Sequence, residues 1–150
     1  MIVLFTRNNS LLSRLITGIT GEDVSHCALC IGDYVIHINL LGLQVQHVVD
    51  FSNQNIVIDA VPLRREILST DRLLEGLVGN GRMGYDYLGL LYLGLRYLIP
   101  ALIPKQNLWQ VSGMFLCTEL VTHLLEGREA SLLTPGQLLA MYLKEINENG

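Results

Sequence analysis

The sequence has few of the features that mark nucleic-acid-binding or disordered proteins. Only 16% of its 150 residues are charged, the formal net charge is −4, and no run of five like charges occurs. A nucleic-acid-binding protein needs a basic stripe that neutralises phosphates, so no nucleic-acid partner is expected. Half of the residues are hydrophobic, which excludes a disordered chain.

The sequence is also poor in cysteine, with only Cys27, Cys30 and Cys117. An odd count without an evident signal peptide does not describe a disulfide framework. We therefore expect a protein that is cytoplasmic as synthesised, in a reducing compartment. A zinc site built on His26 and Cys30 would lack the close ligand spacing usual for zinc, so neither a metal nor a cofactor is expected.

Hydrophobic patterning predicts a single α+β domain over residues 1–150, an antiparallel β-sheet flanked by helices. Apolar or alternating runs indicate five strands: Ile2–Phe5, Val24–Ile31, Tyr34–Leu40, Gln44–Val49 and Ile56–Val61. Helical periods indicate helices over Leu11–Thr17, Asp71–Val78, Tyr87–Ile99 and Ser112–Leu125, and a last helix that Thr134-Pro135-Gly136 opens. Ser10 and Asp86 are the expected caps of the first and third of these helices. Gly18, Pro100 and Gly127 are expected to end the first, third and fourth.

The segment Tyr85–Pro104 is nearly all apolar and about as long as the ~20 residues that span a bilayer. Asp86 and Arg96 are charged, however, and two prolines break the segment near its end. We expect a buried helix that leaves an apolar edge for a protein partner or a lipid surface.

A predicted hairpin carries the first candidate site residues. With a two-residue turn at Gly32-Asp33, Ile31 pairs with Tyr34, which places His26 and His37 diagonally on one face, together with Asn39. The opposite face is expected to be apolar and to pack in the core: Cys27, Leu29, Ile31, Tyr34, Ile36 and Ile38. Imidazoles segregated onto one face of a hairpin indicate a site.

Cys117 is the second part of the site. Leu120, Val121 and Leu124 follow it at helical spacing, so its thiol is expected to face inward near the start of a helix. The positive end of the helix dipole favours a thiolate, and a neighbouring imidazole makes the pair a nucleophile at neutral pH. The predicted catalytic residues are Cys117 as nucleophile, His26 as base and His37 as the residue that orients the base.

The remaining cysteines and histidines have weaker claims. Cys27 faces the apolar side and is expected to be inert, and Cys30 lies mid-strand without a helix terminus to activate it. His47 has no assignable partner, and His123 is expected at the surface of the Cys117 helix. A buried structural cysteine or a hydrogen-bonded core histidine is the commoner explanation for each of these residue types taken alone.

Taken in order, these motifs resemble a known superfamily. The segment from Ser25 to His37 resembles the histidine hairpin of the circularly permuted NlpC-type papain-like cysteine peptidases, which include the lecithin:retinol acyltransferase-like and YiiX-like branches. The nucleophile motif of that superfamily is similar to Phe115-Leu116-Cys117-Thr118-Glu119-Leu120-Val121, and two further family segments are similar to Tyr85-Asp86-Tyr87-Leu88-Gly89 and Thr134-Pro135-Gly136-Gln137-Leu138-Leu139.

The resemblance implies a permuted papain-like fold and thiol chemistry on an amide, ester or thioester. The leading hypothesis is a peptidase or amidase that cleaves cell-wall peptides through a Cys117-His26-His37 triad and a thioester acyl-enzyme, as in bacterial and bacteriophage relatives. One alternative is a lipid acyl hydrolase or acyltransferase with the same triad. Another is a catalytically silent structural component of a phage tail or similar assembly, which would be associated with the virion.

Overall fold

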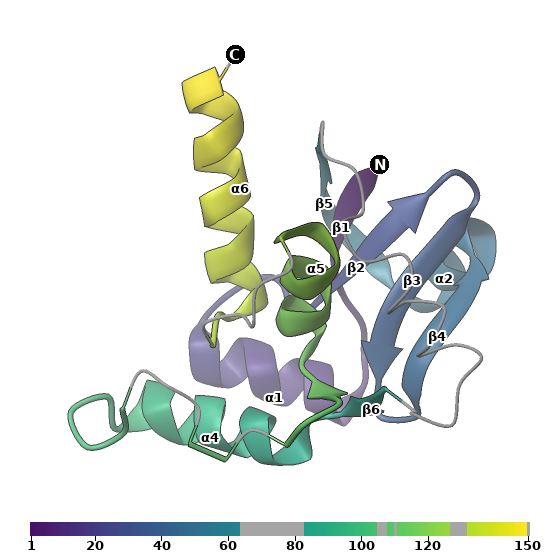
Figure 1. Cartoon of the computed structure of the whole chain (residues 1–150). Coiled ribbons are helices and arrows are strands. Elements are labelled where there is room, and N and C mark those ends of the chain that lie inside the picture. Colours follow the sequence, from purple (N-terminus) through teal and green to yellow (C-terminus); the bar gives the residue numbers. More distant parts are fainter. Residues whose placement is uncertain (64–82, 105–107, 110, 127–131, 150) are drawn as a thin grey trace.

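The sheet contains the five strands that the hydrophobic pattern predicts. The computed structural model describes residues 1–63, 83–104, 108–109, 111–126 and 132–149. Every pairing within the five-stranded sheet is antiparallel, and the strand order is β4-β3-β2-β1-β5 (Figure 1). The strands are β1 (Ile2–Arg7), β2 (His26–Ile31), β3 (Tyr34–Asn39), β4 (Gly42–His47) and β5 (Ile56–Pro62).

Five helices are present among the described residues, which confirms the α+β class. They are α1 (Leu11–Thr20), α2 (Val48–Gln54), α4 (Tyr87–Leu98), α5 (Cys117–Glu126) and α6 (Pro135–Asn149). A short parallel pair, β6 (Gly84–Tyr85) and β7 (Met114–Phe115), connects the start of α4 to the start of α5. The predicted helix over Asp71–Val78 and the predicted helix end at Gly127 lie outside the described residues.

The central hairpin has the predicted register. Ile31 pairs with Tyr34, Cys30 with Val35 and Leu29 with Ile36. Gly32 has φ +57°, a left-handed conformation that residues with a Cβ rarely adopt. The two-residue turn therefore sets which side chains of β2 and β3 share a face.

Both faces of the central hairpin β2–β3 are buried, so the face that carries His26 and His37 is packed as well as the predicted core face. On the α5 side, Cys27, Leu29 and Ile38 belong to the main core. On the α2 side, Phe51 closes a smaller cluster with Leu4, Ala28, Cys30 and Val35. Tyr34, predicted to lie in the core, is 57% exposed because it stands at the turn.

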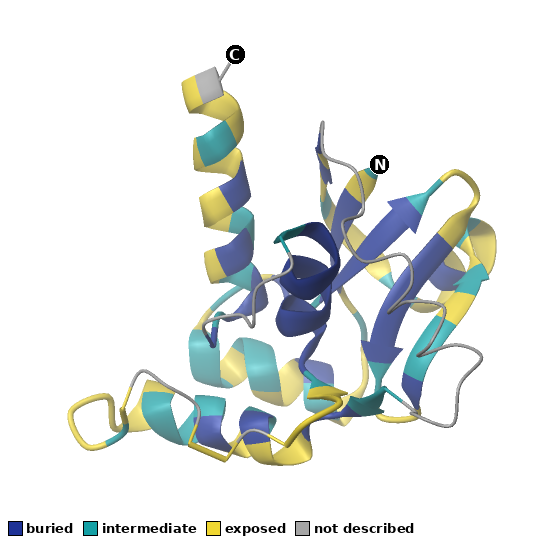
Figure 2. Ribbon diagram, in the orientation of Figure 1, coloured by how far each residue is buried: buried dark blue, intermediate teal, exposed yellow. Residues whose placement is uncertain are grey.

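Helix α5 is the most deeply buried element of the fold. It lies against β2 and β3 in the centre of the molecule, and its described residues from Cys117 to Leu125 are all buried (Figure 2). Leu120, Val121 and Leu124 are at most 1% exposed. Since a fully buried side chain of this size contributes about 1.5–3 kcal/mol, this packing holds the first residue of α5 against the sheet.

Three predicted boundaries are wrong, two for local reasons and one because of a pairing between distant segments. Helix α1 continues past Gly18 to Thr20, because Gly21 adopts φ +68° and its N–H donates to the Thr17 carbonyl at 2.8 Å. The strand predicted to reach Val49 ends at His47, whose Nδ1 accepts the Val49 N–H and caps α2. The helix predicted from Ser112 begins only at Cys117, because Met114–Phe115 pairs with β6.

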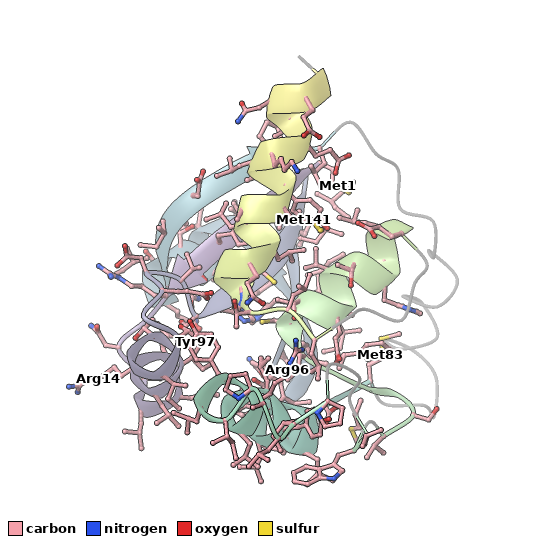
Figure 3. All side chains as sticks on the ribbon, turned by 90° about the vertical axis from the view of Figure 1, so that its left-hand side faces the viewer. Met1, Arg14, Met83, Arg96, Tyr97 and Met141 are labelled. Atoms are coloured by element: carbon pink, nitrogen blue, oxygen red, sulfur yellow. The ribbon has the colours of Figure 1, made fainter. Side chains whose placement is uncertain are left out.

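Helices α1 and α4 lie side by side below the sheet (Figure 1). Asp86 caps α4 as predicted, accepting the Gly89 N–H at 2.7 Å. Tyr97 reaches α1 and donates to the Thr20 carbonyl at 2.6 Å, while Arg14 projects outward (Figure 3). None of the helices within the described residues is both long and apolar enough to cross a membrane.

Helix α6 starts where its sequence predicts, with Thr134 as cap. The Thr134 hydroxyl accepts the Gln137 N–H at 3.2 Å and donates to Glu22 at 2.5 Å. Glu22 also accepts the Gly136 N–H at 3.0 Å, so its carboxylate lies at the positive end of the helix. This contact connects the loop before β2, which leads to His26, with the N-terminus of α6.

Candidate active site

The nucleophile candidate Cys117 is the first residue of α5. Its position is set by a cap at the start of the helix, in which the Glu119 carboxylate accepts the Leu116 N–H at 2.9 Å. Cys117 is 7% exposed and faces the sheet, as predicted. The thiol therefore lies at the positive end of a buried helix dipole.

Contacts with β2 activate this thiol. Hydrogen bonds from the Cys27 thiol and from His26, with the positive charge of His26, hold the pKa of Cys117 well below its ordinary value, although burial acts in the opposite direction. The Cys27 backbone N–H also hydrogen bonds to the Cys117 sulfur. We infer that Cys117 is the thiolate of the pair, because charge and hydrogen bonding favour the anion at this sulfur.

Cys27 has a larger part in the site than its sequence position suggests. Burial, and then its hydrogen bond to Cys117, raises the pKa of Cys27, so Cys27 remains a protonated donor. Its predicted lack of nucleophilic character fits this protonation state. What sequence reasoning missed is the contact with Cys117, which requires α5 to pack on the inward face of β2.

The two predicted histidines lie in direct contact. His26 Nε2 is 3.2 Å from His37 Nδ1, and the rings meet edge to face with centroids 5.3 Å apart. Because Nε2 of His26 is engaged by His37, Nδ1 is the ring nitrogen that remains for Cys117. The structure therefore brings together all three residues that the sequence predicts.

His37 is held as a neutral ring. It is 4% exposed and packs against Phe51 of α2 with ring centroids 5.0 Å apart. Burial, together with the charge of His26, lowers the pKa of His37 to about 3. A neutral imidazole can accept a hydrogen bond at one nitrogen while it donates at the other, which suits an orienting residue.

Gln46 of β4 extends the polar chain and was not predicted. Its side-chain amide nitrogen, Nε2, lies 2.5 Å from Nε2 of His37. Gln44 pairs with His37 across the β3–β4 ladder, so Gln46, two residues further along, shares its face. A correct prediction of the β3–β4 register would have found this residue.

Two cavities meet at the site. One, of about 280 Å³, lies between α1 and α4, is lined mainly by leucine, isoleucine and tyrosine, and includes Cys117 and Thr118. The other, of about 420 Å³, includes His26, His37 and several amide side chains. Four residues line both cavities: Leu12, Ile16, Ser25 and Tyr85.

Ser25 is a polar group at the junction of the cavities, and it is 5% exposed. Its hydroxyl lies 2.6 Å from that of Ser13, which accepts the Asn8 N–H at 3.1 Å. With Ser13 donating to Ser25, the Asn8 N–H and the Ser13 O–H are both used, and the Ser25 O–H is free to donate into the cavities. The other polar residue on both walls, Tyr85, stays a phenol because burial and the charge of Cys117 raise its pKa.

The other cysteine and histidines have structural roles. Cys30 lies in the α2-side cluster, and its thiol donates to the Gly32 carbonyl at 3.6 Å. His47 caps α2. The expectation that His123 lies at the surface is wrong: it is 5% exposed and packs on Phe115, because α5 is buried on all sides. Among the described residues, no group of three potential ligands could hold a metal.

Comparisons with known proteins give no family assignment. The chain matches no protein-family model, no curated protein and no solved structure. The resemblance to permuted NlpC-type peptidases, and the cell-wall and virion roles that it implies, therefore stay predictions. The chemistry of the site has to be argued from its geometry.

Proposed function

We propose that this protein is a cysteine hydrolase that forms a thioester acyl-enzyme on Cys117. The observation that carries the proposal is the unbroken chain of polar contacts from Cys117 through His26 and His37 to Gln46. A thiol with a lowered pKa, a base beside it and a residue that orients the base are the parts that nucleophilic catalysis requires.

The direction of the hydrogen bonds in this chain follows from the chemistry. For His26 to take a proton from Cys117, its Nδ1 must be unprotonated, so its hydrogen lies on Nε2 and is donated to His37. His37 then carries its own hydrogen on Nε2, which Gln46 must accept through Oε1. A half-turn of the Gln46 side-chain amide exchanges the positions of its oxygen and nitrogen. The tautomer of His37 that catalysis requires is the one that needs the oxygen at this position.

The reaction itself has two steps. The Cys117 thiolate adds to a carbonyl carbon, the bond to the leaving group breaks, and the His26 imidazolium gives its proton to the departing atom. Water then loses a proton to His26 and hydrolyses the thioester, which restores the thiol. The Cys117 N–H at the start of α5 and the Ser25 hydroxyl are the oxyanion donors that we propose.

The same geometry supports the finer fold hypothesis. A histidine on a hairpin, a second polar residue on the next strand and a later cysteine at the start of a buried helix are the order expected of a permuted papain-like domain. The proposal that this α+β fold is of that type rests on this order and on the packing of α5 against β2 and β3.

Two substrate classes follow from the proposal. Cell-wall peptides are the first, by resemblance of the motifs. The second is an apolar acyl group, and one observation favours it: the cavity beside Cys117 is lined by leucines of α1 and α4 and has little polar surface. Burial of an apolar chain in this cavity lowers the free energy, whereas a charged peptide would lose its hydration there without gaining a hydrogen-bond or ionic partner.

The test of the proposal is the reactivity of Cys117. We expect iodoacetamide to alkylate it rapidly, with an inflection well below the free-thiol pKa of about 8.5, and we expect His26→Ala to lose this fast phase. Acylation by p-nitrophenyl octanoate should give a burst of one product per active site, absent in Cys117→Ala. Cys30→Ser is the matched control, because Cys30 lies on the same hairpin outside the polar chain.

Slow alkylation that is the same with and without His26 would overturn the hydrolase proposal. Peptidoglycan digestion by the wild type and Cys117→Ala, read by mass spectrometry, then separates the two substrate classes. Equal product release from both proteins would exclude the cell-wall peptidase.

A further inference from the structure

The two cavities divide the site between Cys117 and His26. Cys117 lines only the apolar cavity, and His26 lines only the polar one. Ser25 and Tyr85 stand on the wall between them. The substrate carbonyl must therefore lie at this junction, where Cys117 can attack it and His26 can give a proton to its leaving group. One half of the substrate then lies in each cavity.

The proposed chemistry decides which half lies on which side. The general acid must be within hydrogen-bond reach of the atom that leaves, so the leaving group occupies the cavity that His26 lines. The acyl part stays bound to Cys117 and fills the apolar cavity. This assignment follows from the position of the two residues, whatever the acyl part is.

The lining of the polar cavity is neutral. Its polar side chains other than the two histidines are amides and hydroxyls: Asn8, Ser10, Ser13, Ser25, Asn39, Gln54, Asn55 and Tyr85. Of the described residues that line it, none is Lys, Arg, Asp or Glu. His37 stays neutral above pH 3, and the charge of His26 is balanced by the Cys117 thiolate. An ionic group would lose hydration here without gaining a counter-charge.

Several of these amides are already held in place. Asn39 Oδ1 accepts the Leu41 N–H at 2.8 Å, which orients the side chain, and no described residue takes its amide hydrogens. Asn8 donates one amide hydrogen to Asn55 Oδ1 at 3.1 Å and accepts the Ser10 N–H at 3.0 Å. The cavity thus offers oriented hydrogen-bond donors at fixed positions, which cost little entropy on binding.

We infer that the cavity beside His26 is a leaving-group subsite for a neutral, hydroxyl-bearing alcohol, with Asn39 as its specificity residue. The inference rests on the proposed hydrolase function and adds the chemistry of the group that leaves. In the acylation step the ester C–O bond breaks, the alcohol oxygen takes the His26 proton, and the alcohol departs through this cavity. The acyl carbon keeps its oxidation level, and water completes the hydrolysis.

The test compares octanoyl esters that differ only in the alcohol. We expect kcat/KM for 1-octanoylglycerol to exceed that for ethyl octanoate and for octanoylcholine by roughly 10-fold, the effect of one or two net hydrogen bonds. In Asn39→Asp the Oδ1 acceptor for Leu41 is kept, while a negative charge replaces the amide donor. The ratio of octanoylcholine to 1-octanoylglycerol should then rise by roughly 10-fold.

Each outcome has one meaning. Iodoacetamide alkylation of Cys117 tests the hydrolase proposal separately, and slow alkylation that His26→Ala leaves unchanged removes that proposal and this inference together. The burst amplitude with p-nitrophenyl octanoate counts the active sites, and fast alkylation without a burst overturns this inference alone. A normal burst with equal kcat/KM for the three esters overturns the subsite alone. Gln54→Glu, at an exposed position on the same cavity, repeats the charge test with less risk to folding than a change at half-buried Asn39, and an unchanged choline-to-glycerol ratio in both variants also overturns it.

Discussion

Gln46 gives the most direct test of the polar chain. Its amide is 2.5 Å from Nε2 of His37, which is 4% exposed. In Gln46→Leu this buried nitrogen has no described partner, which costs about 1–3 kcal/mol. Because the same contact selects the tautomer of His37 that orients His26, we expect the loss to appear in the rate of acylation. At 1.36 kcal/mol per factor of ten, the expected decrease is roughly 5- to 150-fold.

Gln46→Glu distinguishes the two orientations of the amide. A carboxylate can only accept a hydrogen bond, so it enforces the tautomer in which His37 donates from Nε2. We expect Gln46→Glu to acylate within about threefold of the wild-type rate, since the bond that it keeps is the one the mechanism uses. The added negative charge should raise the pKa of His37 from its value of about 3.

The assay is the rate of the p-nitrophenyl octanoate burst between pH 5 and 9, with iodoacetamide alkylation as a second readout. Gln44→Leu is the matched control: it lies two residues away on the same strand, and its side chain makes no hydrogen bond within the described structure. A wild-type rate in Gln46→Leu, or an equal loss in Gln46→Glu and Gln46→Leu, would refute the tautomer argument.

Three further predictions follow from the site. Because the pKa of His37 is lowered to about 3 in the folded protein, the unfolded state binds one more proton between about pH 3 and 6.5, so stability falls as pH decreases through this window. In urea titrations, His37→Asn should remove about 1.4 kcal/mol per pH unit of this slope, and an unchanged slope would contradict the assignment. Ser25→Ala should reduce kcat by roughly 10²-fold with little change in KM, as for the loss of one oxyanion donor, and Ser13→Ala should cost less because the Ser25 hydroxyl remains. Glu119→Ala should lower the free energy of unfolding by about 1–2 kcal/mol through loss of the cap on Leu116, whereas Glu119→Gln, which keeps an acceptor, should lose less.

Local rules account for much of the fold. Gly32-Asp33 between two apolar runs predicts the hairpin and its register, and Ser10, Asp86 and Thr134 cap helices at the predicted positions. The errors lie where a second local signal, or a pairing with a distant segment, overrides the first. His47 caps α2 in the middle of an alternating run, and the pairing of β7 with β6 shortens the helix predicted from Ser112.

The candidate site, like the fold, is predicted in part by local sequence patterns. The sequence by itself determined that His26 and His37 share a face, because a two-residue turn and the period of two in a strand leave no other arrangement. It also determined that Cys117 faces inward near a helix start, because the apolar residues that follow it have helical spacing.

Only the tertiary structure decided what these residues meet. The contact of Cys117 with Cys27 exists because α5 packs on the inward face of β2, and Gln46 reaches His37 because β4 pairs with β3 in one register. The burial of His123 and the separation of an apolar from a polar cavity also depend on elements that are distant in the chain. Turns and periods act over a few residues, whereas these contacts arise from packing between segments whose separation no local rule encodes.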